Sequence, residues 1–210
     1  MTFDGAVFEA REINAWRGDR HILREVSFSV RPGEFLKVTG PNGVGKTTLL
    51  RVICGLLPAE TGELWWRGQS VRGRRDEFNF ELGHLGHLNS LKGDLTAREN
   101  LKFLAGLRTT LTAQTIDATL DRVGILSRGD LPARSLSAGQ KRRLALARLL
   151  LADAALWILD EPVTNLDTAG IRLVEELIVD HVERGGLAIA AAHQRLLDDA
   201  PCLRRLELEP

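Results

Sequence analysis

The feature that most constrains this chain is a glycine-rich loop at residues 40–47, with the sequence GPNGVGKT. The loop matches the phosphate-binding pattern G-x-x-x-x-G-K-[ST], in which glycines let backbone N–H groups close around phosphate oxygens. The apolar, strand-like FLKV precedes the loop, and TLLRVICGLL, with apolar residues at helical spacing, follows it. The order strand, loop, helix brings the positive end of a helix to the phosphates, so the sequence predicts a P-loop NTPase core.

The side chains at the end of this loop have the chemistry that a nucleoside triphosphate requires. Lys46 would reach the β and γ phosphates, and the hydroxyl of Thr47 would complete the octahedral shell of a magnesium ion. The alternative is a glycine turn that only starts a helix. The predicted nucleotide-binding residues of the loop are Gly40, Pro41, Asn42, Gly43, Val44, Gly45, Lys46, Thr47 and Thr48.

Two adjacent carboxylates, Asp160 and Glu161, end the apolar segment ALWIL. Charge at the end of a buried strand is costly unless a cation or a reaction uses it. We expect Asp160 to hold the magnesium ion, directly or through water, and Glu161 to act as general base towards the attacking water. A strand end that reaches solvent in an acidic turn is the alternative. Together with Lys46 as a catalytic residue, the pair predicts nucleotide hydrolysis.

Strand-like and helix-like segments alternate along the chain, which predicts an α/β fold with a largely parallel sheet. Residues 5–38 are β-rich, and Pro32 and Gly33 are predicted to form a hairpin turn. Residues 72–76 are predicted to be a charged turn between two strands. A helix is predicted over residues 169–184, followed by a glycine turn and a further strand.

The middle of the chain has a helical pattern. It extends over residues 94–126, with Thr96 as the expected N-cap and Glu99 as its capping-box partner. A second helix is predicted from about residue 141 to residue 151. Its first residues, the basic triplet at 141–143, are predicted to be a solvated face without a functional role.

The composition excludes several classes of protein. With 44% hydrophobic and 27% charged residues, the chain can bury a sizeable core. Its 28 basic residues equal its 28 acidic residues, so no net field favours nucleic acid as a partner. Cys54 and Cys202 are expected to be packing residues in a reducing cytosol. The acidic N-terminus is not expected to be a signal peptide, and no run approaches the roughly 18 apolar residues of a membrane span.

The segments RSLSAGQKRR and TNLD, taken with the glycine-rich loop and the acidic strand end, resemble the motifs of the ATP-binding cassette (ABC) ATPases. The resemblance implies a head-to-tail dimer in which two subunits sandwich ATP. It also implies that Asp167 crosses the dimer interface and that His193 is a catalytic switch that senses the γ-phosphate. The signature residues, which would contact ATP held by the second subunit, are Ser137, Ala138, Gly139 and Gln140.

Each of these assignments has a local alternative. The signature loop is alternatively a helix N-cap with a small-residue turn. Asp167 is alternatively a cap of the helix that follows it, and His193 a strand-end histidine with satisfied hydrogen bonds.

The resemblance also implies the architecture of a single ABC-type ATP-binding domain over residues 1–210. The nucleotide-binding core would comprise about residues 1–86 and 152–210 and include a small antiparallel β subdomain. The α-helical subdomain would comprise about residues 87–151. Residues 87–100 would line a groove that receives a helix of a membrane subunit.

Two positions depart from the family pattern. His87 stands where the family has a glutamine that contacts magnesium and the attacking water, so the coupling of hydrolysis to the partners is expected to be unusual. Arg17 stands where an adenine-stacking aromatic residue is expected, with Trp16 beside it. A guanidinium also stacks on a base, so both residues are candidates for the adenine contact.

The segments RRDEF, LGHLNSLKGDLTARENLKF and LWILDEPVTNLD resemble one branch of the family, the ATP-binding subunit of the haem exporter of cytochrome c maturation. This implies ATP and Mg²⁺ as cofactors and a homodimer or paired ATPase subunit on the cytoplasmic face of the bacterial inner membrane. It further implies integral membrane partners (CcmB- and CcmC-like) and no nucleic acid. The alternatives are an ABC transporter with another cargo, a soluble cassette ATPase acting on nucleic acid or the ribosome, and a regulatory module that barely hydrolyses ATP.

Overall fold

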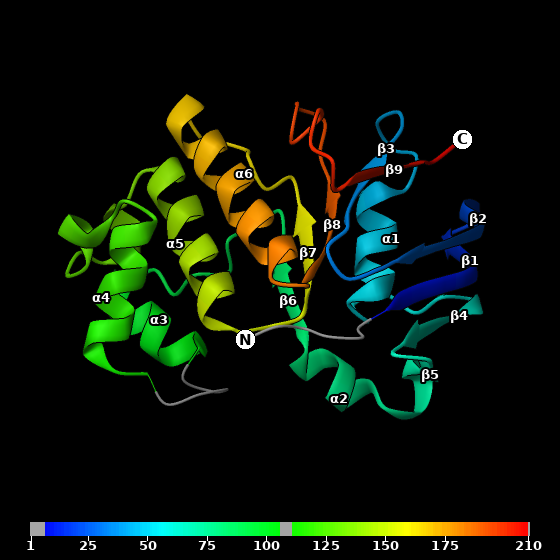
Figure 1. Cartoon of the computed structure of the whole chain (residues 1–210), viewed down its shortest axis with the longest axis horizontal. Coiled ribbons are helices and arrows are strands. Elements are labelled where there is room, and N and C mark those ends of the chain that lie inside the picture. Colours follow the sequence, from blue (N-terminus) through cyan, green and yellow to red (C-terminus); the bar gives the residue numbers. More distant parts are fainter. Residues whose placement is uncertain (1–6, 106–110, 210) are drawn as a thin grey trace.

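The computed structural model describes residues 7–105 and 111–209. This part of the chain forms two β-sheets with helices packed around them (Figure 1). The segment 1–6, on which the signal-peptide expectation partly rests, lies outside the described residues, as do residues 106–110 of the predicted helical stretch. Within the described ranges, no helix combines the length and apolarity needed to cross a membrane.

A small antiparallel sheet is built from the N-terminal third of the chain, with the strand order β2-β1-β4-β5. Its strands are β1 (Phe8–Arg17), β2 (Arg20–Val30), β4 (Thr61–Trp66) and β5 (Gln69–Ser70). The first two strands form a hairpin in which Arg17 lies opposite Arg20 and Trp16 lies opposite His21. The predicted β-rich start of the chain is therefore present over its described residues.

A five-stranded parallel sheet forms the centre of the molecule, with the order β6-β7-β8-β3-β9. Its strands are β3 (Phe35–Thr39), β6 (Leu82–Leu85), β7 (Leu156–Asp160), β8 (Leu187–Ala191) and β9 (Leu203–Glu207). Every residue of β7 and β8 is buried, as expected for parallel strands covered on both faces. The predicted α/β fold is confirmed. The edge strand β9 was not predicted, because three of its five residues are charged, and its two leucines are only half-buried.

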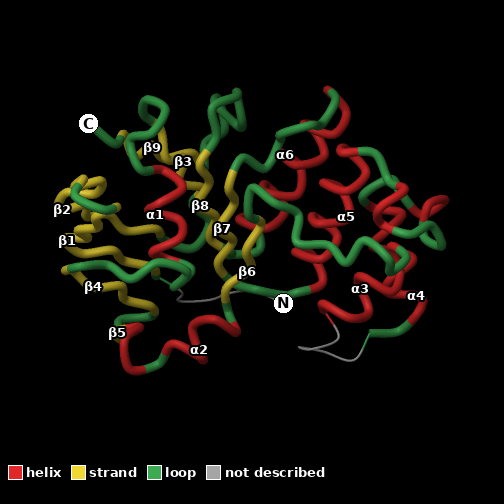
Figure 2. The backbone as a smooth tube through the Cα atoms, turned by 180° about the vertical axis from the view of Figure 1, so that it is seen from behind, coloured by secondary structure: helices red, strands yellow, loops and turns green. Residues whose placement is uncertain are grey.

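The helices cover the two faces of the parallel sheet. They are α1 (Lys46–Ile53), α2 (Arg75–Phe80), α3 (Ala97–Ala105), α4 (Ala113–Arg122), α5 (Ala138–Leu151) and α6 (Thr168–Glu183). Short 3₁₀ turns occur at Val71–Gly73, Leu126–Arg128 and Ala133–Ser135. Figures 1 and 2 show α1 between the two sheets, α5 and α6 on the other face of the parallel sheet, and α3 and α4 beyond α5. The buried residues accordingly form two apolar clusters, one on each side of the parallel sheet.

Two local predictions are wrong. Pro32 and Gly33 do not form a hairpin turn, because the chain there passes from β2 of the antiparallel sheet to β3 of the parallel sheet. The predicted charged turn at residues 72–76 instead contains a 3₁₀ turn and the start of α2. Phe78, 2% exposed, stacks on Phe8 at 6.0 Å between ring centroids, so tertiary packing of one aromatic residue stabilises a helix that its charged neighbours do not indicate.

Two helices of the middle region, α3 and α5, begin with capping boxes. The backbone N–H of Thr96 donates to Glu99 Oε2 at 2.8 Å, and the N–H of Glu99 donates to Thr96 Oγ1 at 3.2 Å, which confirms the predicted pair. The hydrogen bond from the Thr96 backbone lowers the pKa of Glu99. The second box joins Ser137 and Gln140, so α5 begins at Ala138, three residues earlier than predicted.

A buried histidine joins α6 to the central sheet. His181 is 1% exposed, and its ring stacks on Trp157 of β7 at 4.0 Å between ring centroids. Burial lowers the pKa of His181 to about 4, while its hydrogen bond to the Leu187 carbonyl opposes the shift. The folded chain therefore binds fewer protons than the unfolded chain between about pH 6.5 and pH 4, so the free energy of unfolding decreases as the pH falls through this window, by roughly 3 kcal/mol in all.

We expect the substitution His181→Phe to remove this pH dependence, because phenylalanine keeps an aromatic ring against Trp157 without a titrating nitrogen. Urea unfolding at pH values from 7.5 to 4.5 checks it. The free energy of unfolding of the wild type should decrease more steeply below pH 6.5 than that of the variant, whatever the variant's stability at pH 7.5. Parallel curves for the two proteins would contradict the assignment.

Candidate functional site

The glycine-rich loop leaves the carboxyl end of β3 and leads into α1, as the sequence predicts. Gly40 has a φ of +132°, and a Cβ there would lie 2.5 Å from the carbonyl oxygen of Leu208, so only glycine fits this close approach. Lys46 is buried and its Nζ donates to the carbonyl oxygens of Gly40 at 2.7 Å and Pro41 at 2.9 Å. Burial lowers the pKa of Lys46, and the charge of Glu161 opposes the shift. The loop thus curls over its own lysine.

The structure brings Thr47 and Asp160 together, although Asp160 lies 113 positions after Thr47 in the sequence. The Thr47 hydroxyl donates to Asp160 Oδ1 at 3.0 Å. Asp160 is 5% exposed and ends β7, at the carboxyl edge of the sheet, where the loop begins. A hydroxyl and a carboxylate at this distance are oxygen ligands of the kind Mg²⁺ takes together with substrate phosphates and water, so the residues present fit the ion.

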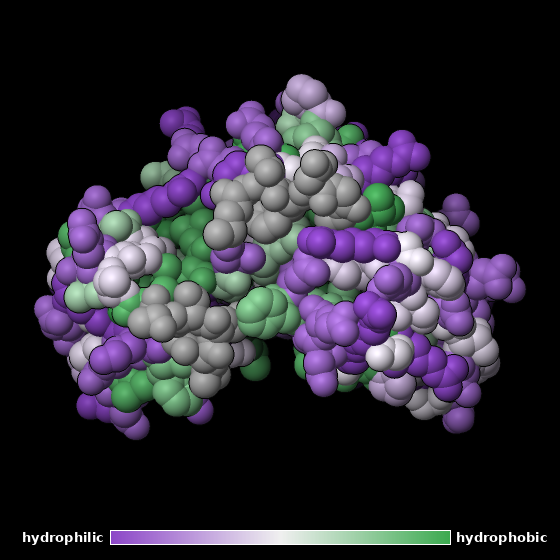
Figure 3. Space-filling model, turned by 60° about the horizontal axis from the view of Figure 1, so that its bottom comes forward, coloured by the Kyte–Doolittle hydropathy of each residue, from purple (hydrophilic) through white to green (hydrophobic). Residues whose placement is uncertain are grey.

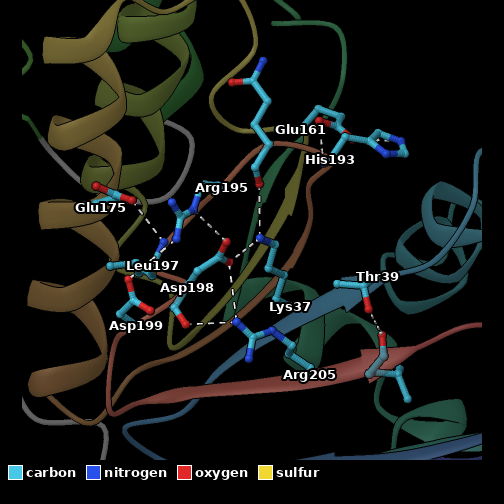
Figure 4. Close-up of polar contacts among 12 residues, drawn as sticks. Lys37, Thr39, Glu161, Glu175, His193, Arg195, Leu197, Asp198, Asp199 and Arg205 are labelled. Atoms are coloured by element: carbon cyan, nitrogen blue, oxygen red, sulfur yellow. Dashed lines mark hydrogen bonds and ion pairs between the residues drawn. The ribbon is translucent and has the colours of Figure 1, made fainter.

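Glu161 and His193 lie next to this pair. The backbone N–H of His193 donates to Glu161 Oε2 at 3.4 Å, and His193 Nε2 lies 3.6 Å from Glu161 Oε1 (Figure 4). The side chain of Glu161 is 18% exposed and that of His193 is 48% exposed. The predicted general base and the predicted switch histidine are therefore neighbours, and both are partly open to solvent.

The loop that carries His193 is anchored to the strand that carries the P-loop. Lys37 of β3 is buried, and its Nζ donates to the Gln194 carbonyl at 3.1 Å and to Asp198 Oδ1 at 2.6 Å (Figure 4). The hydrogen bond from Lys37 lowers the pKa of Asp198. The sequence shows a lysine at position 37, but it does not show that this lysine is buried and has acceptors in a distant loop.

The signature residues lie on the other face of the parallel sheet from α1, so one chain does not bring them to its own P-loop (Figures 1 and 2). Ser137 is exposed, and its Oγ accepts a hydrogen bond from the backbone N–H of Gln140 at 3.2 Å. A Cβ on Gly139 would lie 3.0 Å from the Asn165 carbonyl, which favours glycine at this position. Ala138 is exposed.

Asp167 begins α6 as its N-cap and accepts a hydrogen bond from the Gly170 N–H at 2.8 Å. That hydrogen bond, with the charge of Arg143 at 3.3 Å, lowers the pKa of Asp167. The local alternatives for the signature loop and for Asp167, that each caps a helix, are thus present in the structure. They leave both groups exposed at the same surface, because Gly139 packs on the loop that Asp167 ends.

The two departures from the family pattern lie apart from each other. His87 is exposed in the loop that follows β6. Trp16, 48% exposed, stacks on His21 at 4.5 Å between ring centroids, and His21 lines a small pocket with Asn42 of the P-loop. Arg17 is exposed at the hairpin end. His21 was missed, although a two-residue turn at positions 18–19 would have paired it with Trp16.

The prediction that the basic triplet at 141–143 is a solvated face is wrong. Arg142 is 2% exposed and points into the protein, where it contacts the backbone on both sides of Glu161. Arg143 donates to the Val123 carbonyl at 3.0 Å. Charge in a sequence does not reveal whether carbonyl oxygens from other segments converge on it, and here they do.

Exposed apolar side chains occur near the segment predicted to meet a membrane partner. Leu88 is 78% exposed, Phe80 at the end of α2 is 62% exposed, and Phe103 of α3 is 50% exposed. Seen from the side of α2 and α3, the surface is hollowed between the helical and the β-rich parts, and apolar surface gathers along the hollow (Figure 3).

Comparison with known proteins adds to this geometry. The ABC transporter family matches residues 23–164. The cytochrome c biogenesis ATP-binding export protein CcmA 2 of Cupriavidus metallidurans is 46% identical over 192 residues, which cover 91% of each chain. The CcmA proteins of Vibrio vulnificus and Nitrosococcus oceani are 40% and 48% identical, over 96% and 86% of this chain and 99% and 82% of theirs.

Two solved structures have a similar fold. One, described as the structure of the ATP-binding subunit of an ABC transporter, has a TM-score of 0.83 and 21% identity, over 97% of this chain and 88% of that one. The other, a putative ABC transporter ATP-binding protein from Pyrococcus furiosus, has a TM-score of 0.82 and 25% identity, over 96% of this chain and 97% of that one.

Proposed function

The chain belongs to the ABC transporter family of ATP-binding proteins, and on this premise we propose that it is the ATP-hydrolysing subunit of a complex that drives haem export in c-type cytochrome biogenesis. The observation that carries the proposal is the identity of 40–48% to cytochrome c biogenesis ATP-binding export proteins over at least 86% of the chain. Another ABC transporter with a different cargo is the alternative, because fold and P-loop chemistry do not name a cargo.

We propose that hydrolysis takes place between the P-loop and the carboxyl ends of β7 and β8. Lys46 would leave its carbonyl partners and bind the β and γ phosphates, because phosphate oxygens carry full negative charge. Glu161 would accept a proton from the attacking water, and His193, 3.6 Å away, would contact the γ-phosphate. Thr47 and Asp160 would hold Mg²⁺, which would neutralise charge that develops on the phosphates.

The exposed signature loop supports a head-to-tail dimer. Within one chain the parallel sheet separates α5, which Ser137 caps, from α1, which Lys46 begins, so an ATP bound to this P-loop would meet the signature residues of a second subunit (Figures 1 and 2). Asp167 would lie at the same interface. Trp16, stacked on His21 beside the P-loop, is a better candidate than Arg17 for the adenine contact, because the stacked pair offers a flat face near Asn42.

We further propose the division into a core of about residues 1–86 and 152–210 and a helical subdomain of about residues 87–151. The groove along residues 87–100, with Leu88 exposed, would receive a helix of an integral membrane subunit, CcmB- or CcmC-like. The subunit would then sit peripherally on the cytoplasmic face of the bacterial inner membrane, without a nucleic acid partner.

The proposal is tested with Lys46→Ala as the sole copy of the protein in cells, assayed by haem staining of c-type cytochromes on a gel. We expect loss of the stained bands while the variant protein stays at wild-type abundance in the membrane fraction. The matched control is Lys102→Ala, an exposed lysine of α3, which should keep the staining. Unchanged staining with Lys46→Ala would overturn the cytochrome assignment and favour another cargo.

A further inference from the structure

Arg142 of α5 uses all its hydrogen-bonding capacity inside the protein. A guanidinium has five N–H donors, and each finds a different acceptor here. Nε donates to the Pro162 carbonyl at 3.1 Å, and Nη2 donates to the carbonyls of Asp160 and Glu161 at 2.8 and 2.7 Å. Nη1 donates to the Gly86 carbonyl at 2.8 Å and to Asn89 Oδ1 at 3.1 Å. The side chain therefore joins three separate segments of the chain.

The backbone that Arg142 holds is strained. Glu161 has a φ of +50°, a left-handed conformation that a residue with a Cβ adopts only where its surroundings enforce it. Three backbone contacts hold this residue: its N–H donates to the Ala191 carbonyl at 2.8 Å, and its carbonyl accepts from Arg142 at 2.7 Å and from the Thr164 N–H at 3.2 Å. Since Arg142 also binds the carbonyls on either side, the three consecutive peptide groups that aim the Glu161 carboxylate are held by one side chain.

The other contacts of Arg142 lie at functional segments. Gly86 immediately precedes His87, in the loop predicted to meet a membrane partner. Arg142 itself lies one helical turn after Ala138, at the start of the helix that carries the signature loop. A shift of α5 or of the loop after β6 would therefore act directly on the backbone of Glu161.

We propose that Arg142 is a positioning residue for ATP hydrolysis, which holds the strained backbone of Glu161 so that its carboxylate faces the attacking water and links it to the His87 loop and the signature helix. The inference rests on the proposed ATPase function. It does not depend on the cargo. Burial lowers the pKa of Arg142 to about 10, opposed by the charges of Asp160 and Glu161, so the side chain stays charged at neutral pH.

The test compares Arg142→Lys with Arg148→Lys in the purified full-length chain. Arg148 is a matched control, because it lies on the same helix, is half-buried and donates at 3.4 Å to the carbonyls of His84 in β6 and Ser90 in the loop that follows. Among the described residues it donates no hydrogen bond to the carbonyls of residues 160–162. Lysine keeps the charge but cannot reach five acceptors. We expect kcat to fall about 100-fold in Arg142→Lys, with KM and the Kd for ATP within about threefold of wild type. Arg148→Lys should change kcat by less than about threefold.

Equal losses of kcat in the two arginine variants, or a parallel loss of ATP binding, would show a structural role only and overturn the proposal. If Arg142→Lys does not fold, Asn89→Ala tests the same link, because it removes one acceptor and leaves the arginine. It should lower kcat severalfold at unchanged Kd, and no effect would overturn the proposal. ATP hydrolysis by the wild-type chain tests the proposed function, whereas the ratio of the kcat values of Arg142→Lys and Arg148→Lys tests only the positioning role.

Discussion

Replacing Glu161 by glutamine should abolish most ATP hydrolysis while ATP still binds. The amide is close to isosteric and can still accept a hydrogen bond from the His193 N–H, so the local structure is kept. It cannot accept a proton, and loss of a general base typically costs about 100- to 10,000-fold in rate. Because the P-loop and the signature loop are untouched, ATP should remain trapped between two subunits. Phosphate release gives the rate, and light scattering after size-exclusion chromatography with ATP gives the mass of the particle.

Glu175→Gln is the matched control for this experiment. Glu175 of α6 accepts a hydrogen bond from the Leu197 N–H at 3.0 Å, in the same loop that carries His193, but it does not contact Glu161 (Figure 4). The Glu175→Gln variant should hydrolyse ATP at close to the wild-type rate. Two results would go against the argument: an ATP-loaded Glu161→Gln protein that is only monomeric would count against the sandwich, and retained hydrolysis would count against Glu161 as the base.

The second large effect is expected from Asp160→Asn. Asparagine can still accept a hydrogen bond from the Thr47 hydroxyl, so the contact at 3.0 Å is kept while the buried negative charge is lost. A neutral amide is a weaker ligand for Mg²⁺ than a carboxylate. We expect kcat to fall by at least about 100-fold, in the range seen when one stabilising group at developing charge is removed. Mg²⁺ should no longer tighten ATP binding, and titrations of ATP with and without EDTA check this.

The control is Asp153→Asn, which changes an exposed carboxylate shortly before the same strand. It should keep both the hydrolysis rate and the effect of Mg²⁺ on ATP binding. Suppose that Asp160→Asn binds ATP in EDTA as tightly as the wild type does, and that Mg²⁺ tightens its ATP binding as much as in the wild type. The ion is then held elsewhere, and the assigned role of Asp160 is wrong.

The parts of the fold that sequence patterns predict are those set by near neighbours. The capping box of Thr96 and Glu99 is one example, since its partners are three residues apart. The continuous apolar segments before Asp160 and after Gly186 predict buried parallel strands for the same reason. The meeting of Thr47 and Asp160 follows from a general rule, that carboxyl ends of parallel strands share one edge of the sheet.

The elements that were missed depend on distant partners. α2 forms where Phe78 packs against Phe8, and β9 forms because β3 offers it an open edge with a parallel register. The hairpin at Pro32 and Gly33 fails because the next strand pairs with β8 instead of β2. The local sequence decides none of these outcomes, because each depends on which packing arrangement of the whole molecule has the lower free energy.

The sequence by itself determined the phosphate loop, the acidic strand end and the α/β class, because each depends on residue types at short, regular spacing. Only the tertiary structure decided which charges are buried. In the sequence, nothing distinguishes Lys37 and Arg142 from lysines and arginines that are exposed, yet both are buried. The physical reason is that burying a charge costs free energy unless several acceptors converge on it, and here those acceptors come from segments far apart in the chain.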